Sequence, residues 1–123
     1  MKDIQSLDDI KLLVDTFYAK VRVDDKLGPI FIQVIKDQWP AHLEKMYRFW
    51  QSILLGEPTY NGRPFPPHVV LPIGMAHFNR WIQLFHATLD EHFEGPVADE
   101  ARDRSVKIAQ VFMAKLDSIR SSY

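Results

Sequence analysis

The stretch GRPFPPHVVLPIGMAHF, from Gly62 to Phe78, decides how the chain is interpreted, because it encloses His68 among four prolines. Two of these prolines stand directly before the histidine and fix φ there, and Pro72 prevents the turn that follows from growing into a long helix. We expect about one turn of helix around His68, within an irregular connection from Glu57 to Gly74. A surface histidine needs no such rigid backbone, so His68 is a candidate functional residue.

Patterns typical of helices lie on both sides of this connection. Ser6 followed by Asp9 resembles a capping box, and apolar residues then recur at the spacing of one helical face as far as Val21. Glycine, proline and apolar positions predict four further helices: a short one from Pro29, one from about Trp39 to before Gly56, one from Gly74 to Gly95, and one from about Val97 to Ser118. No strand pattern or repeat is found, so the sequence predicts an all-α fold with a single domain over residues 1–123.

The composition excludes several classes of function. Fifteen Lys and Arg residues oppose sixteen Asp and Glu residues, giving a formal charge of −1, which provides no field for attracting nucleic acid or an anionic membrane. The chain has no cysteine, so disulfides, thiolate catalysis and Cys-ligated metal sites are excluded. Any metal chemistry must therefore use histidine and carboxylate ligands.

The hydropathy pattern predicts a cytoplasmic protein. Asp3, Asp8 and Asp9 interrupt the first ten residues where an export signal would need an apolar stretch. The longest run without a charge, Pro64 to Asn79, is too short and too rich in proline to cross a bilayer as a helix. We expect neither a membrane nor a nucleic acid as a partner.

The five histidines are not equivalent. His86, Asp90 and His92 have a spacing that a zinc site could use, but polar residues near a helix end usually form a solvated face. His77 flanks an apolar helical face and is interpreted as structural. His68 by itself is also compatible with a histidine that is hydrogen-bonded at a junction between loop and core.

Aromatic and polar residues of three predicted helices face one interior. Phe17 and Tyr18 end the face of the first helix, and Trp81 lies in the middle of the face of the fourth. His42 begins the face of the third, where Met46 and Trp50 follow. Buried Tyr and Trp need hydrogen-bond acceptors, and a ligand on a metal opposite His68 would provide one. The same residues are compatible with an ordinary core, so a cofactor-free all-α interaction module remains the alternative.

Four stretches in this order resemble the truncated haemoglobins, and among these the third group. The matching stretches are FYAKVRVDDKLGPIF (17–31), WPAHLEKMYRFW (39–50), LLGEPTYNGRPFPPHVVLPI (54–73) and HFNRWIQLF (77–85). Each motif is weak alone, but the ordered set spans nearly the whole chain. The absence of a Gly-Gly pair fits the third group better than the first two groups.

This resemblance implies a truncated globin fold, in which a two-over-two helical sandwich surrounds haem b (iron protoporphyrin IX). It implies that His68 is the proximal iron ligand, that Tyr18 and Trp81 are distal hydrogen-bond donors to an iron-bound diatomic ligand, and that His42 lies on the distal side. The remaining side chains expected at the haem faces or the distal wall are Phe17, Phe31, Met46 and Trp50.

The resemblance also implies a gaseous ligand, which is O₂, NO or CO. Two hydrogen-bond donors would favour O₂ and slow its release, which argues against oxygen delivery. Peroxidase-like and NO dioxygenase-like activity both stay open, and either would require a reductase that the sequence does not identify.

Overall fold

A computed structural model describes residues 1–57 and 74–121 of the chain, with side chains up to Lys115. The proline connection and His68 therefore lie outside the described residues. The expectations placed there, the single helical turn and the position of the His68 imidazole, stay predictions.

All regular structure in the described ranges is helical. The helices are α1 (Leu7–Val23), α2 (Gly28–Ile35), α3 (Trp39–Leu54), α5 (Met75–His92) and α6 (Pro96–Ser121). Each of α2, α3, α5 and α6 begins within one residue of its predicted start. The all-α prediction is confirmed. No described helix is both long and apolar enough to cross a membrane.

The start of α1 differs from its prediction in one detail. Ser6 is the N-cap residue, but its side chain makes no capping hydrogen bond to the helix backbone. The Asp9 carboxylate instead accepts a hydrogen bond from the backbone N–H of Gln5 at 2.9 Å, and its other oxygen forms an ion pair with Lys2 at 2.9 Å. The carboxylate thus fixes the chain before the helix without the reciprocal bonds of a capping box.

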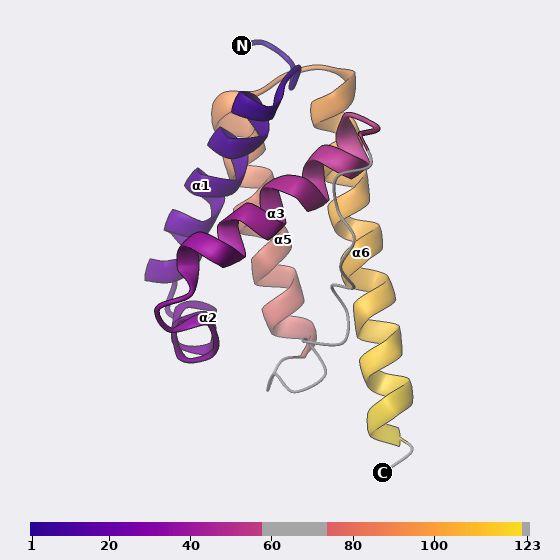
Figure 1. Ribbon diagram of the computed structural model, residues 1–123. Helices are drawn as coiled ribbons and strands as arrows, with labels where there is room; N and C mark the ends of the chain where they lie inside the picture. The colour runs from indigo at the N-terminus through magenta and orange to yellow at the C-terminus, as the bar shows by residue number, and fades with distance from the viewer. Residues whose placement is uncertain (58–73, 122–123) are drawn as a thin grey trace.

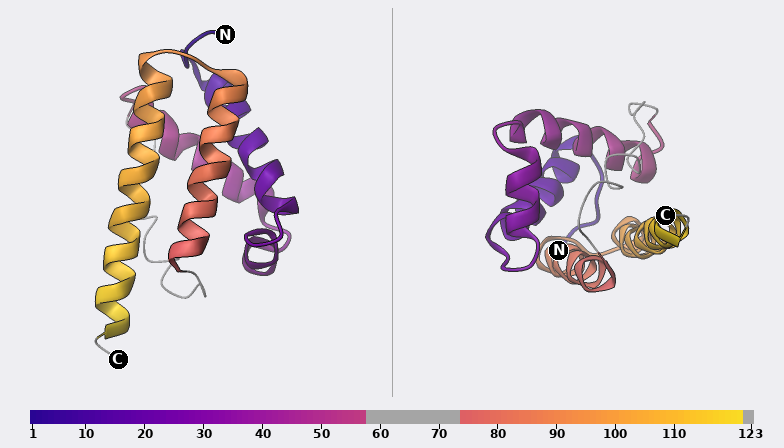
Figure 2. Two further views of the ribbon diagram at one scale, coloured as in Figure 1. Left: turned by 180° about the vertical axis from the view of Figure 1, so that it is seen from behind. Right: turned by 90° about the horizontal axis from the view of Figure 1, so that it is seen from below.

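The long helices form two pairs. In Figure 1, α1 and α3 cross, while α5 and α6 lie side by side and run in opposite directions. The view from behind in Figure 2 shows the same antiparallel pair. Contacts of α1 with α5 and of α3 with α6 join the two pairs. This arrangement is the expected two-over-two sandwich.

The hydrophobic core lies where the pairs meet. Its fully buried large side chains include Leu13 and Phe17 of α1 and Phe85 and Leu89 of α5. Burying one such side chain contributes about 1.5–3 kcal/mol. The interface between α1 and α5 is therefore a main source of stability, and it carries the residues expected in the distal pocket.

The corner between α1 and α2 depends on a glycine. A Cβ atom at Gly28 would lie 2.9 Å from the carbonyl oxygen of Arg22 and 3.2 Å from that of Val21. Asp24 closes the same corner, because one carboxylate oxygen accepts the backbone N–H of Leu27 while the other accepts Arg80 Nε of α5 at 2.6 Å. The end of α1 is thereby attached to α5.

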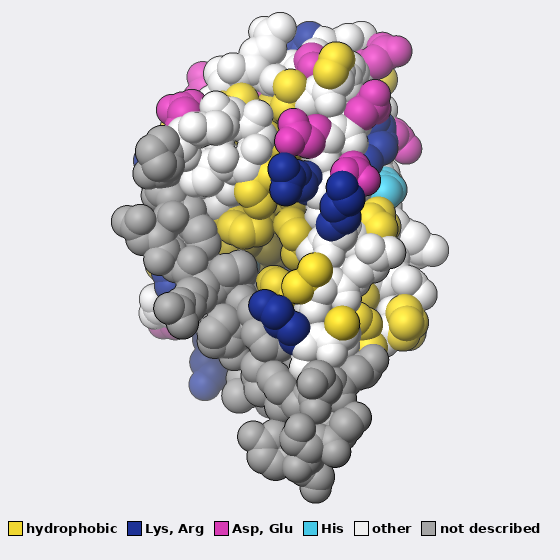
Figure 3. Space-filling model, turned by 90° about the vertical axis from the view of Figure 1, so that its right-hand side faces the viewer, with side chains coloured by type: hydrophobic (Ala, Val, Ile, Leu, Met, Phe, Trp, Pro, Cys, Tyr) yellow, Lys and Arg dark blue, Asp and Glu magenta, His cyan; other side chains and the backbone are white. Residues whose placement is uncertain are grey.

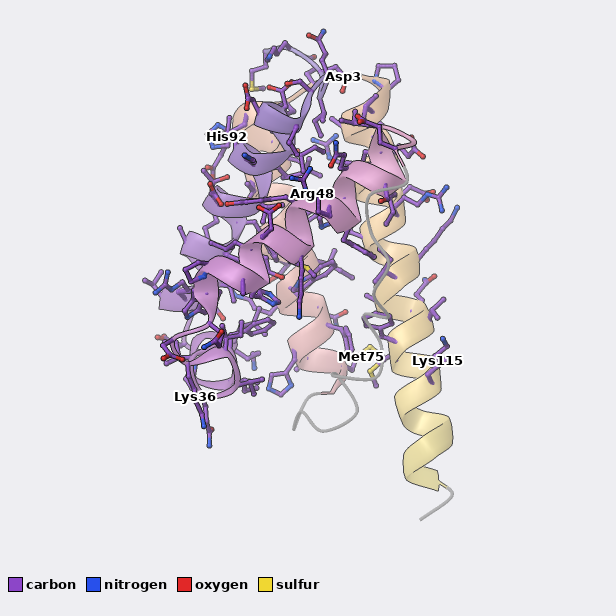
Figure 4. All side chains as sticks on the ribbon, viewed as in Figure 1. Asp3, Lys36, Arg48, Met75, His92 and Lys115 are labelled. Carbon is purple, nitrogen blue, oxygen red and sulfur yellow. The ribbon has the colours of Figure 1, made fainter. Side chains whose placement is uncertain are left out.

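The N-terminal segment caps the last helix. The Asp3 carboxylate accepts the backbone N–H groups of Val97 at 2.9 Å and Ala98 at 2.8 Å. Figure 4 shows Asp3 at the end of the molecule where α6 begins. Gly95, with φ of +138°, turns the chain directly beneath this carboxylate. A carboxylate at a helix N-terminus satisfies N–H groups that the helix leaves unpaired.

Candidate functional site

A continuous aromatic wall connects α1, α3 and α5. The Phe17 ring meets Trp81 edge to face at 5.6 Å and Phe85 at 5.2 Å between ring centroids. Phe85 is also stacked against Trp81 at 5.5 Å and against Trp50 at 4.8 Å between ring centroids. Such ring pairs prefer these geometries and hold each other in fixed orientations. The wall is therefore both apolar and rigid.

Tyr18 places a polar group at the edge of this wall. Its side chain is 6% exposed, and its ring meets those of Phe17 at 4.9 Å and Phe31 at 6.1 Å. Burial raises the pKa of the Tyr18 phenol, so the hydroxyl stays protonated at physiological pH. No hydrogen bond between described residues involves this hydroxyl. Tyr18 is thus a buried neutral hydrogen-bond donor.

His42 lies directly against Tyr18. The two ring centroids are 5.1 Å apart and nearly perpendicular, and Nε2 of His42 is buried. Met46 follows one turn later on α3 and packs, half-buried, against the same hydrophobic cluster. A phenol, an imidazole and the indole of Trp81 therefore border one apolar region.

Comparison with known proteins shows the family to which the chain belongs. A family model for bacterial-like globins matches residues 3–116. The chain belongs to the bacterial-like globin family. The globin is 36% identical over 111 residues to a group 3 truncated haemoglobin of Campylobacter jejuni, a match that covers 87% of each chain.

A solved structure agrees with this assignment. The crystal structure of a group III truncated haemoglobin from Campylobacter jejuni matches the globin with a TM-score of 0.85 at 35% identity, and covers 94% of this chain and 95% of the other. Both the resemblance to the third group and the truncated globin fold are confirmed. Family membership implies a haem cofactor.

The described residues fit a haem group. A porphyrin has apolar faces, and the wall formed by Phe17, Trp81 and Phe85 is apolar. Tyr18 is buried, and a polar ligand beside it would accept a hydrogen bond from its hydroxyl within this apolar region. On the face shown in Figure 3, hydrophobic side chains gather in a hollow near the middle, with Lys and Arg side chains beside it.

The structure brings together all the predicted site residues that it describes. Phe17, Tyr18 and Trp50 are buried members of one hydrophobic cluster, and the half-buried Phe31, Met46 and Trp81 pack against it, while His42 joins it through Tyr18. His68, the predicted metal ligand, is the one candidate outside the described residues. The roles of these residues toward haem remain predictions.

The other histidines have structural partners. His77 Nδ1 accepts the backbone N–H of Gly74 at 3.0 Å and so closes the start of α5, as the structural interpretation predicted. His86 Nε2 lies 3.0 Å from Ser105 Oγ and joins α5 to α6. No group of three or more potential metal ligands exists among the described residues. They therefore contain no zinc site built on His86, Asp90 and His92, and Asp90 instead pairs with Arg102.

Two site residues were missing from the sequence-based set. Phe85 is the ring that joins Trp81 to Trp50. Trp39 was interpreted as the start of α3 only, yet it is 7% exposed and its ring meets both Tyr18 and His42. The position of Trp39, one helical turn before His42, was the signal that could have identified it.

Proposed function

We propose that this globin binds haem b, with His68 as the proximal iron ligand, and that it holds a diatomic gas beside Tyr18, Trp81 and His42. The observation that carries the proposal is the buried Tyr18, whose hydroxyl stays protonated and whose ring lies against His42 at 5.1 Å between centroids. The names of the Campylobacter relatives support the same class of protein. When bound, haem supplies the ferrous iron that takes the gas.

The chain's own residues would select and retain the gas. Tyr18 and the indole N–H of Trp81 donate hydrogen bonds to a ligand that carries partial negative charge, which favours O₂ over CO. Each neutral hydrogen bond contributes about 0.5–1.5 kcal/mol, or up to about tenfold in affinity. The aromatic contacts of Phe17 with both side chains keep these donors in place. Two donors imply slow release of O₂.

Slow release favours turnover or detoxification over oxygen delivery, since a carrier must release its ligand. We therefore propose a redox role, the handling of nitric oxide or of peroxide, in which a reductase returns the iron to the ferrous state. NO and CO would enter the same pocket. Among these ligands O₂ benefits most from the two hydrogen-bond donors, because it acquires the most negative charge.

Reconstitution with hemin tests the proposal. The purified protein should take up one equivalent of hemin and develop an intense Soret band. The reduced form should bind O₂ and CO with distinct visible spectra. A protein that stays colourless after reconstitution contradicts the proposal and leaves the cofactor-free interaction module as the better interpretation.

A further inference from the structure

An arginine and a tryptophan lie together beside Tyr18 and His42. The guanidinium of Arg22 lies over the Trp39 ring, 4.4 Å from its centroid, in the geometry of a cation–π contact. Trp39 is buried whereas Arg22 is exposed. The arginine therefore stands between this indole and the solvent.

The covered tryptophan contacts the two polar residues nearest to the proposed gas site. Its ring lies 5.9 Å from that of Tyr18, at 65°, and 6.0 Å from that of His42, at 90°. Arg22 follows Tyr18 by four residues on α1, and Trp39 precedes His42 by three residues on α3. Both spacings place the partners on the same helical face. The four side chains thus form one layered contact between α1 and α3.

We infer that Trp39 is a positioning residue that holds the His42 imidazole against Tyr18, and that Arg22 holds Trp39 in place over the solvent side of the pocket. A histidine at the edge of a pocket can rotate toward solvent only if its neighbours leave room. Trp39 lies against the His42 ring and beneath Arg22, so we expect it to restrict this rotation. This inference rests on the proposed function, because it assumes that His42 borders a gas-binding site. The contacts among Arg22, Trp39 and His42 are nevertheless contacts of the protein itself.

Modification of His42 tests the inference without a measurement of gas binding. In the haem-loaded protein, the rate at which diethyl pyrocarbonate modifies His42, followed by mass spectrometry, reports how often the imidazole reaches solvent. Arg22→Gln should raise this rate by about two- to fivefold, the factor that corresponds to about 0.5–1 kcal/mol of cation–π contact. Arg22→Lys keeps a cation and should restore much of the protection.

Two matched controls separate this effect from general changes. Arg104→Gln removes an exposed arginine of α6 that pairs with Glu100, and it should leave the modification of His42 unchanged. His77, whose Nδ1 is engaged at the start of α5, serves as an internal reference in each sample. Equal His42 rates in the wild type and Arg22→Gln would overturn the role of Arg22.

Substitutions of Trp39 test the second half of the inference. Trp39→Phe keeps an aromatic face and should stay within about twofold of the wild type. Trp39→Leu should expose His42 to modification and speed CO binding after flash photolysis. Phe93→Leu, a change in the buried core at the end of α5, controls for loss of stability.

The outcomes distinguish this inference from the proposed function. If Trp39→Leu and Phe93→Leu raise the modification of His42 equally, Trp39 is an ordinary core residue and the inference fails. If the protein takes up no hemin, the proposed function fails, while the modification rates of the protein as purified still report on the contact between Arg22 and Trp39.

Discussion

At the scale of single residues, Tyr18 carries the proposed chemistry. Its hydroxyl is buried and protonated, so it can donate a hydrogen bond but carries no charge. We expect Tyr18→Phe to speed O₂ dissociation by up to about tenfold, the equivalent of one lost hydrogen bond. Stopped-flow displacement of O₂ by CO measures this rate.

Trp81→Phe provides the comparison, because it removes the second donor while keeping an aromatic ring against Phe17 and Phe85. CO dissociation should change less than O₂ dissociation in both variants, since CO is the weaker hydrogen-bond acceptor. Rates equal to the wild type in both variants would remove Tyr18 and Trp81 as donors.

The sequence predicted individual site residues when their helical face pointed inward. Phe17, Tyr18, Met46 and Trp50 follow from apolar spacing, because residues three and four apart share a face. Contacts between helices do not follow from spacing, since they depend on how α1 crosses α3. The contact between Arg22 and Trp39 therefore could not be predicted from the sequence and is seen only in the structure.

At the scale of helices, the corner between α1 and α2 leaves no room for a side chain at Gly28. We expect Gly28→Ala to lower the free energy of unfolding by about 1–3 kcal/mol, because the new methyl group would meet the Arg22 and Val21 carbonyl oxygens. Thermal unfolding followed by circular dichroism measures the loss.

Gly74→Ala is the matched control for this change, since nothing lies within 4 Å of a Cβ atom there and φ is not positive. This variant should unfold within about 0.5 kcal/mol of the wild type. Similar losses in both variants would mean that close backbone approach at Gly28 is not the cause.

The ion pair between Asp24 and Arg80 attaches this corner to α5. Arg80→Gln should cost about 1 kcal/mol of stability, because the pair is half-exposed at the arginine while the carboxylate is buried. Urea unfolding measures the cost. Arg104→Gln, which disturbs an exposed ion pair, should cost less, and the opposite order would contradict the proposed attachment.

Helix boundaries were predictable because glycine and proline mark them. Pro29, Gly74 and Pro96 all stand at or next to the starts of helices in the structure. The side-chain cap of α1 was not predictable, since the Ser6 hydroxyl donates to the Asp9 carboxylate at 3.5 Å instead of capping the helix backbone, and Asp9 also bonds to Gln5 and Lys2. Side-chain choices of this kind depend on which partners the fold brings near.

At the scale of the whole molecule, hydrogen-bonded carboxylates make stability depend on pH. Burial by itself raises the pKa values of Asp3, Asp9 and Asp24, but hydrogen bonds more than offset it, so all three lie below the ordinary value of 3.8. These bonds come from backbone N–H groups in each case, and also from Lys2 at Asp9 and Arg80 at Asp24.

The sign of the effect follows from these lowered pKa values. As pH falls below about 5, the unfolded chain takes up protons before the folded chain does, so the free energy of unfolding decreases. The stabilisation that the three carboxylates provide is complete when the pH is above the ordinary aspartate pKa. It is lost as the pH falls through their lowered pKa values in the folded protein. Urea unfolding between pH 3 and pH 7 should show this loss in the haem-free protein.

Asp24→Asn should lower stability at pH 7 and make its decrease toward low pH less steep, because one titrating group is gone. If the free energy of unfolding of Asp24→Asn decreases with falling pH as steeply as that of the wild type, Asp24 does not contribute to acid unfolding.

The most direct test of the account concerns the bond between His68 and the haem iron. We expect the ferrous wild-type protein to give the visible spectrum of a histidine-ligated haem, and His68→Gly to lose its haem or to regain this spectrum only when imidazole is added. If His68→Gly keeps the wild-type ferrous and ferrous–CO spectra without imidazole, another residue binds the iron and the central claim is wrong.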